Sequence, residues 1–202
     1  MTRAAQVDPP TEPASPTGPR GPLLVVIDMQ QVFADPASPW AAPRFAEALP
    51  SVRSLLAAFG DRAVLTRFVA PEAPEGAWVD YYRQWPFARQ PPTAPLWDLV
   101  PHLDVGSRPV LDAGTFGKWD ARLAALVDPV PGIVLVGVST DCCVLSTALA
   151  AADAGVAVRV AADACAGATD ADHHRALDAM ALYAPLVAIT TVEEVLATAP
   201  PG

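Results

Sequence analysis

Short apolar runs rich in β-branched residues alternate with helical patterns along most of this chain, and this alternation limits the fold more than any other feature. The run LLVVI at residues 23–27 contains no polar residue before Asp28, which is typical of a strand buried on both faces. Strand–helix alternation implies right-handed βαβ crossovers with helices on both faces of a sheet. We therefore predict an α/β fold, a Rossmann-like three-layer α/β/α arrangement with a central, mainly parallel sheet of about six strands. The predicted strands cover residues 23–28, 63–68, 108–112, 132–138, 157–163 and 186–190, and the predicted helices cover 41–59, 119–127, 143–154, 170–181 and 192–197.

The length of 202 residues suits one domain, which we place at residues 22–198. Residues 1–21 are rich in proline and lack an apolar core segment, so they predict a disordered tail and not a secretory signal peptide. The domain prediction is therefore a single α/β unit preceded by this tail.

Charge and hydropathy exclude two classes of partner. The formal net charge is -9 and no cluster of Lys or Arg is present, which argues against nucleic acid. No apolar run reaches the roughly 18 to 20 residues of a membrane helix, which argues against a membrane partner. Three cysteines, two of them adjacent, do not form a disulfide framework and favour a reducing cytoplasm. We expect a small-molecule partner, because α/β sheets of this kind bind small molecules beyond the carboxyl ends of their strands.

Two strand ends carry the candidate site, because parallel α/β sheets bind ligands beyond the carboxyl ends of their strands. Asp28 ends the first strand, and Cys142 and Cys143 begin the helix after GIVLVGV. A cysteine in the first helical turn lies near free amide groups and the positive end of the dipole, which favour the thiolate. Adjacent positions differ by about 100° around a helix, so we expect one reactive and one packing cysteine. The residues alone also allow a turn-forming Asp28 and two core cysteines.

The segments LLVVIDMQQVF, GVSTDCCVLSTALAAADAGVAVRVAADACAG and TVEEVL resemble the isochorismatase-like cysteine hydrolases. The resemblance implies an α/β/α hydrolase that cleaves small amides, imides or a vinyl ether with an Asp, a Lys and a Cys. It assigns the nucleophile to Cys143, the cysteine directly before Val, and the carboxylate to Asp28. It also implies a cis peptide bond between Val138 and Ser139, in the region that holds the oxyanion. Family members are often dimers or larger, so it implies a homo-oligomer.

The expected lysine is where the sequence departs from this family. The resemblance places that lysine at Ala113, whereas the nearest lysine in the chain is Lys118. Lys118 either reaches the site from a different backbone position or faces solvent. The predicted function is hydrolysis of a small C–N bond through a thioester on Cys143. The alternative is a catalytically silent relative that binds a small ligand or a protein partner.

The middle of the chain predicts no metal site and no cofactor. Metal-binding members of the family carry histidines in this region, but the segment WVDYYRQWPFARQPP contains none. Its aromatic residues predict either a pocket wall or the packing of a long connection or subunit interface. Among them we take Trp78, Tyr82 and Trp85 as the pocket candidates.

Overall fold

The computed structural model describes residues 21–127 and 131–198, which form a three-layer α/β/α fold as predicted. Its sheet has six parallel strands in the order β3-β2-β1-β4-β5-β6. The predicted tail, apart from Gly21, lies outside the described residues. The strands are β1 (Leu23–Ile27), β2 (Ala63–Phe68), β3 (Val110–Ala113), β4 (Ile133–Val138), β5 (Val158–Ala166) and β6 (Val187–Thr190).

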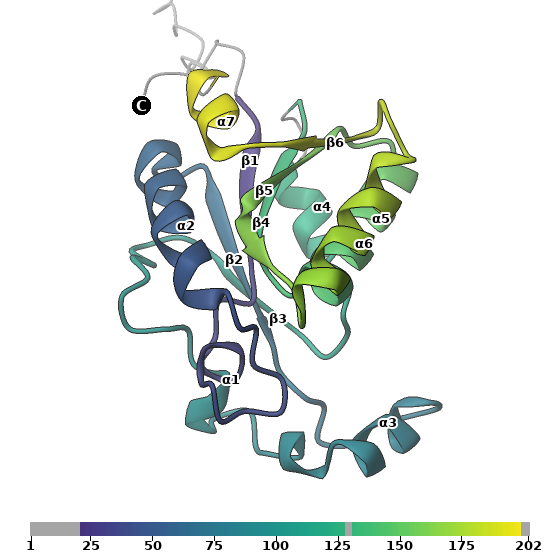
Figure 1. Ribbon diagram of the computed structural model, residues 1–202. Coiled ribbons are helices and arrows are strands. Elements are labelled where there is room, and N and C mark those ends of the chain that lie inside the picture. Colours follow the sequence, from purple (N-terminus) through teal and green to yellow (C-terminus); the bar gives the residue numbers. More distant parts are fainter. Residues whose placement is uncertain (1–20, 128–130, 199–202) are drawn as a thin grey trace, which may run out of the picture.

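Helices cover both faces of the sheet and bury alternate residues of the central strand β1. Leu24 and Val26 pack in the core on one face, while Val25 and Ile27 pack in the core on the other face. All four side chains are fully buried, as the uninterrupted apolar run predicts. Figure 1 shows α2 and α7 on one face and α4, α5 and α6 on the other. These helices are α2 (Phe45–Phe59), α4 (Ala121–Val127), α5 (Leu145–Asp153), α6 (Asp170–Ala181) and α7 (Val192–Thr198).

The strand order places the topological switch point at β1. The chain first builds outward from β1 through β2 to β3, and then crosses back to place β4 on the other side of β1. Ile27 at the end of β1 lies opposite Gly137 near the end of β4. A side chain at Gly137 could not be accommodated, since a Cβ there would lie 2.1 Å from the carbonyl oxygen of Ile27. The close approach brings the residues after β1 and β4 to the same edge of the sheet.

Several boundaries differ from the sequence prediction. The helix expected from residue 41 begins at Phe45, and the helix expected from residue 119 begins at Ala121. The helix expected from Cys143 begins instead at Leu145, after a π-helical turn, η3 (Thr140–Val144). β5 continues to Ala166, three residues beyond its predicted end. Apolar runs predicted the interiors of the strands correctly. Helix starts that lack a capping side chain could not be located from the sequence in this way.

Short helices that the sequence analysis missed gather beyond the carboxyl ends of the strands (Figure 1). They are too short to show a helical period of apolar residues. They comprise α1 (Gln31–Ala34), α3 (Trp78–Gln84), η1 (Pro86–Ala88) and η2 (Pro95–Trp97). Within the described residues, no helix combines the length and the apolar character needed to cross a membrane.

Candidate active site

Asp28 is a fully buried carboxylate at the carboxyl end of β1. Its backbone adopts φ +47°, a left-handed conformation that is uncommon for residues other than glycine. Its Oδ1 accepts a hydrogen bond of 2.6 Å from the hydroxyl of Thr66 on β2, and its backbone N–H donates to the same hydroxyl oxygen at 3.2 Å. Thr66 therefore fixes the carboxylate from two directions. A buried charge of this kind is costly unless it is paired, so Asp28 requires a cation.

Gln30, two residues further along, ties the end of β1 to its surroundings. Its side-chain amide donates to the carbonyl oxygens of Phe68 at 2.9 Å and Trp97 at 2.7 Å, and its Oε1 accepts from the backbone N–H of Phe68 at 2.7 Å. All three bonds are buried. Gln30 thus holds the ends of β1, β2 and η2 together, and the sequence analysis assigned it no role.

Lys118 supplies the cation that Asp28 requires. Its Nζ lies 2.9 Å from Asp28 Oδ2, and the two side chains are 1% and 0% exposed. The same ammonium donates to the carbonyl oxygen of Thr115 at 2.8 Å and lies 4.9 Å from the centre of the Phe68 ring. Lys118 is the only lysine of the chain. The alternative of a solvent-facing Lys118 is therefore wrong, because its charge is buried and paired.

Ala113 ends β3, and its carbonyl oxygen accepts the backbone N–H of Val69. The ammonium expected at this position is thus delivered by a residue five positions later, from the loop that joins β3 to α4.

Cys143 lies in the turn η3, directly after β4. It is 3% exposed and packs in the core on the face of α5 and α6. The Val138–Ser139 peptide bond that precedes this turn is cis, at the position that the resemblance implies. The turn is also held from α6, because the buried Thr140 hydroxyl makes a 2.8 Å hydrogen bond with His173 Nδ1.

The surroundings of Cys143 affect the pKa of its thiol in opposing directions. Burial raises the pKa of the Cys143 thiol well above its usual value, and the negative charge of Asp28 raises it further, while the ammonium of Lys118 lowers it. Burial therefore opposes the thiolate that the helix terminus is expected to favour. The Cys143 thiol thus lies near the Asp28 carboxylate, whose charge favours the protonated thiol.

Thr147 connects the two segments that carry Lys118 and Cys143. Its hydroxyl donates to the carbonyl oxygen of Cys143 at 2.6 Å and accepts the backbone N–H of Lys118 at 2.9 Å. The side chain is fully buried on α5, one turn after the cysteine. One hydroxyl therefore sets the spacing between the nucleophile turn and the lysine loop, a role that no local sequence pattern indicates.

Cys142 and Asp141 lie beside Cys143 on the same turn. Cys142 Sγ is 3.6 Å from Asp141 Oδ2, and burial together with the Asp141 charge raises the pKa of the Cys142 thiol to about 11. Asp141 Oδ1 accepts from the Ser139 hydroxyl and the Ala168 backbone N–H, each at 2.9 Å. All three cysteines of the chain, including Cys165, are free.

A cavity of about 340 Å³ opens onto this turn. Both Cys142 and Cys143 line it, so the expectation that only one of them faces the site is wrong. Both cysteines lie in a π-helical turn, so the spacing of about 100° that holds for an α-helix does not apply to them. Asp28 and Lys118 are not among the lining residues and lie in the interior. The lining residues are Phe33, Pro39, Trp40, Ala41, Phe68, Tyr81, Trp85, Phe116, Ser139, Asp141, Cys142, Cys143 and Ala168.

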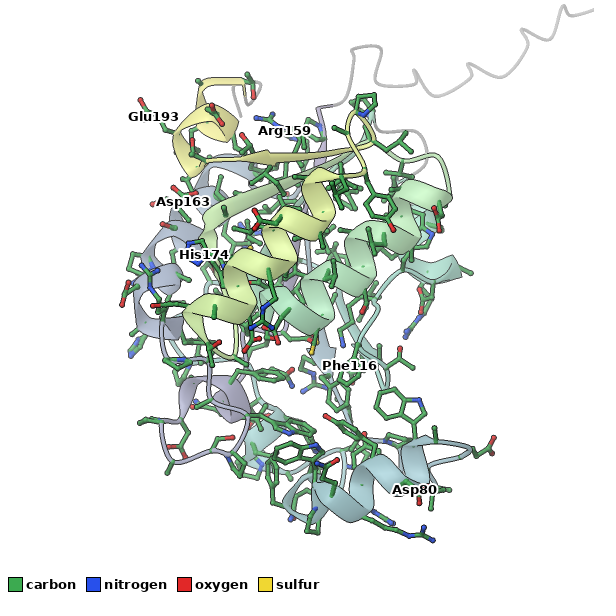
Figure 2. All side chains as sticks on the ribbon, turned by 45° about the vertical axis from the view of Figure 1, so that its right-hand side comes forward. Asp80, Phe116, Arg159, Asp163, His174 and Glu193 are labelled. Carbon is green, nitrogen blue, oxygen red and sulfur yellow. The ribbon has the colours of Figure 1, made fainter. Side chains whose placement is uncertain are left out.

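The aromatic wall of the cavity comes only in part from the residues singled out in the sequence. Trp85 lines the cavity, whereas Trp78 and Tyr82 do not. Tyr82 is 2% exposed and packs within the core, and Trp78 packs against Phe116 with ring centres 5.1 Å apart. Figure 2 shows Phe116 between the body of the molecule and α3, with Asp80 on the outer side of that helix.

Trp40 also belongs to this wall, although it was not among the predicted pocket residues. Its ring centre lies 5.0 Å from that of Phe87, 5.5 Å from Phe68, 6.0 Å from Tyr81 and 6.2 Å from Trp85. It therefore joins the loop after α1 to the aromatic residues of the segment between β2 and β3. Its position in a loop, outside any periodic pattern, gave no signal of this role.

The described residues contain no group of three or more His, Cys, Asp or Glu side chains that could hold a metal ion. The side chains that the site does provide are a thiol on the cavity wall and, in the interior, a carboxylate paired with an ammonium.

Comparison with known proteins agrees with the fold. The family described as "Isochorismatase domain" matches residues 22–194. A cysteine hydrolase from Pseudomonas syringae pv. phaseolicola superposes with a TM-score of 0.78 at 20% identity, covering 91% of this chain and 94% of that one. No curated protein sequence matches the chain.

Two further solved structures share the fold. An isochorismatase family protein from Desulfovibrio vulgaris gives a TM-score of 0.75 at 20% identity and covers 88% of this chain and 99% of that one. A pyrazinamidase from Pyrococcus horikoshii, solved in complex with zinc, gives 0.69 at 24% identity and covers 85% and 99%.

Proposed function

The chain belongs to the isochorismatase domain family, and from this premise we propose that it is a cysteine hydrolase that cleaves the C–N bond of a small amide or imide. The reaction proceeds through a thioester on Cys143. The observation that carries this proposal is the buried ion pair between Lys118 and Asp28, which stands behind a thiol on the wall of a cavity.

In the proposed first half-reaction, substrate enters the cavity and Asp28 takes the proton of the Cys143 thiol. Sulfur attacks the carbonyl carbon, and backbone amides of the turn that carries Cys143 hold the negative oxygen. Asp28 then gives its proton to the leaving nitrogen, and the C–N bond breaks. Because burial raises the pKa of the free Cys143 thiol, we propose that its proton leaves as the sulfur bonds to the carbonyl carbon.

In the proposed second half-reaction, Asp28 takes a proton from a water that enters through the cavity. The water oxygen attacks the thioester, the C–S bond breaks, and the proton returns to sulfur as the acid leaves. Lys118 exchanges no proton in either half-reaction. It pairs with Asp28 and favours negative charge on Cys143, because its ammonium lowers the pKa of that thiol.

The alternative of a catalytically silent relative rested on Ala113, where the lysine of the family is missing. The ammonium of Lys118 lies 2.9 Å from Asp28, and this pairing supports the hydrolase over that alternative.

A matched pair of cysteine variants tests the proposal. Cys143→Ala should abolish ammonia release from a panel of small primary amides, while Cys142→Ala should retain most of it. Mass spectrometry of the acid-quenched wild-type protein should find an acyl group on the peptide that contains Cys143. Equal loss of activity in the two variants, or acylation of Cys142, would contradict the assignment.

A further inference from the structure

The cavity wall carries a negative charge that no described residue neutralises. Asp141 lines the cavity and takes part in no ion pair among residues 21–127 and 131–198. Its Oδ1 accepts two hydrogen bonds, and its Oδ2 has the Cys142 thiol at 3.6 Å. The other carboxylate of the site, Asp28, is balanced by Lys118. The charge that a ligand meets in this cavity is therefore that of Asp141.

The described lining residues include no Lys, Arg or His. The neighbouring arginines are engaged elsewhere: Arg67 forms a two-pronged pair with Asp112, Arg83 pairs with Asp80, and Arg89 donates to the carbonyl oxygen of Glu72. An anionic substrate group would lose its hydration here without gaining a cationic partner, which is unfavourable in a partly enclosed space.

The rest of the wall is aromatic. Six rings line the cavity, those of Phe33, Trp40, Phe68, Tyr81, Trp85 and Phe116. Burial raises the pKa of the Tyr81 phenol, with both cysteines of the turn adding to the rise, so this ring stays uncharged near the thiols. Aromatic rings attract cations through their electron-rich faces, most strongly for Trp and Tyr. Rings around an unpaired carboxylate form a surface that suits a positively charged organic group.

From these observations we infer that the substrate is an amide whose non-reacting end carries a positive charge, such as an alkylammonium group. This inference rests on the proposed function and adds the substrate class to it. The reacting carbonyl lies at Cys143, while the cationic end lies among the aromatic rings beside Asp141. The net charge of -9 adds a field of the same sign, which favours the approach of cations over anions.

The first measurement is calorimetric binding to the full chain carrying Cys143→Ala, so that binding is read without turnover. Three amides of similar size serve as probes: 4-(trimethylammonio)butanamide, its neutral isostere 5,5-dimethylhexanamide, and the anion glutaramate. We expect the cation to bind about tenfold more tightly than the isostere, about 1.4 kcal/mol, and the anion to bind most weakly. Equal binding of cation and isostere, tighter binding of the anion, or no binding of the cation overturns the inference.

Two variants locate the preference on the wall. Asp141→Asn keeps an oxygen acceptor for Ser139 and Ala168 but removes the charge, and Trp40→Leu removes one ring. Each should reduce the advantage of the cation, whereas Asp178→Asn should not, because it removes an equal charge from an exposed position on α6 that does not line the cavity. A cation advantage unchanged in both wall variants contradicts the assignment.

Ammonia release from the same amides by the wild-type protein separates the inference from the proposed function. Selective binding of the cation without hydrolysis of any amide would count against the proposed hydrolase and leave the binding preference in place. Hydrolysis of glutaramate in preference to the cation would leave the hydrolase and overturn the preference.

Discussion

Replacing Lys118 by methionine should destabilise the protein far more than loss of an ordinary ion pair. The ammonium and the Asp28 carboxylate are 2.9 Å apart, and their side chains are 1% and 0% exposed. Removing one member of such a pair leaves an uncompensated charge in the interior, which costs about 3–5 kcal/mol. The Thr66 hydroxyl donates to Asp28 with or without Lys118, so this hydrogen bond does not replace the lost ammonium.

A double-mutant cycle separates this pairing from other effects of the substitution. Asp28→Asn alone should cost a similar amount, since it strands the ammonium in the interior. The double variant Asp28→Asn/Lys118→Met has no buried charge at this place, and it should be more stable than the sum of the single losses by at least about 2 kcal/mol. Urea unfolding followed by far-UV circular dichroism gives the free energies of unfolding and the slopes needed for the comparison.

The exposed pair Arg67–Asp112 provides the matched control. Its atoms are 2.6 Å apart, closer than those of the buried pair, but its side chains are 26% and 44% exposed. Arg67→Met should therefore cost no more than about 1 kcal/mol. If Lys118→Met costs no more than Arg67→Met, or if the losses at Asp28 and Lys118 simply add, the reasoning from burial and pairing is refuted.

Two further predictions concern the geometry and protonation of the nucleophile. Thr147→Val should lower kcat about tenfold or more with little change in KM, because it removes the hydroxyl that spaces the Cys143 turn from the Lys118 loop. Thr147→Ser should restore kcat, and a loss confined to KM would argue against a positioning role. Iodoacetamide should label Cys143 slowly at pH 7 in the free protein and faster as the pH rises beyond about 8.5, since burial raises its pKa. Peptide-resolved labelling that is already at its maximum below pH 7 would mean that the resting group is a thiolate.

The sheet could be predicted from the sequence because strands buried on both faces consist almost entirely of apolar residues. The run LLVVI is buried on both faces, and each of the predicted runs overlaps a strand of the sheet. The helix after β4 was harder to place, because its first turn is π-helical and no side chain caps it. α3 is too short to reveal a period, although it contributes Tyr81 to the cavity.

The site was predictable to the extent that it follows strand ends. Asp28 directly follows β1, and Cys143 lies in the turn after β4. These strand ends flank the switch point, where α/β sheets bind their ligands. Thr66, Thr147 and Trp40 were not found, because each acts through a contact with a residue distant in the sequence. Such contacts depend on the tertiary structure and leave no local pattern in the chain.

The position of Lys118 follows from the need of the buried Asp28 for a cation, and the family pattern alone does not find it. A family pattern identifies a lysine by its place in the sequence and finds Ala113 instead, but the physical requirement is only that an ammonium reach Asp28. Asp28 follows a strand buried on both faces, so a carboxylate there needs a cation from some other segment. The chain contains one lysine, and Thr147 holds its backbone beside the nucleophile turn. Asking which residue pairs with the buried Asp28 therefore identifies Lys118, whereas the family pattern identifies Ala113, which has no charge.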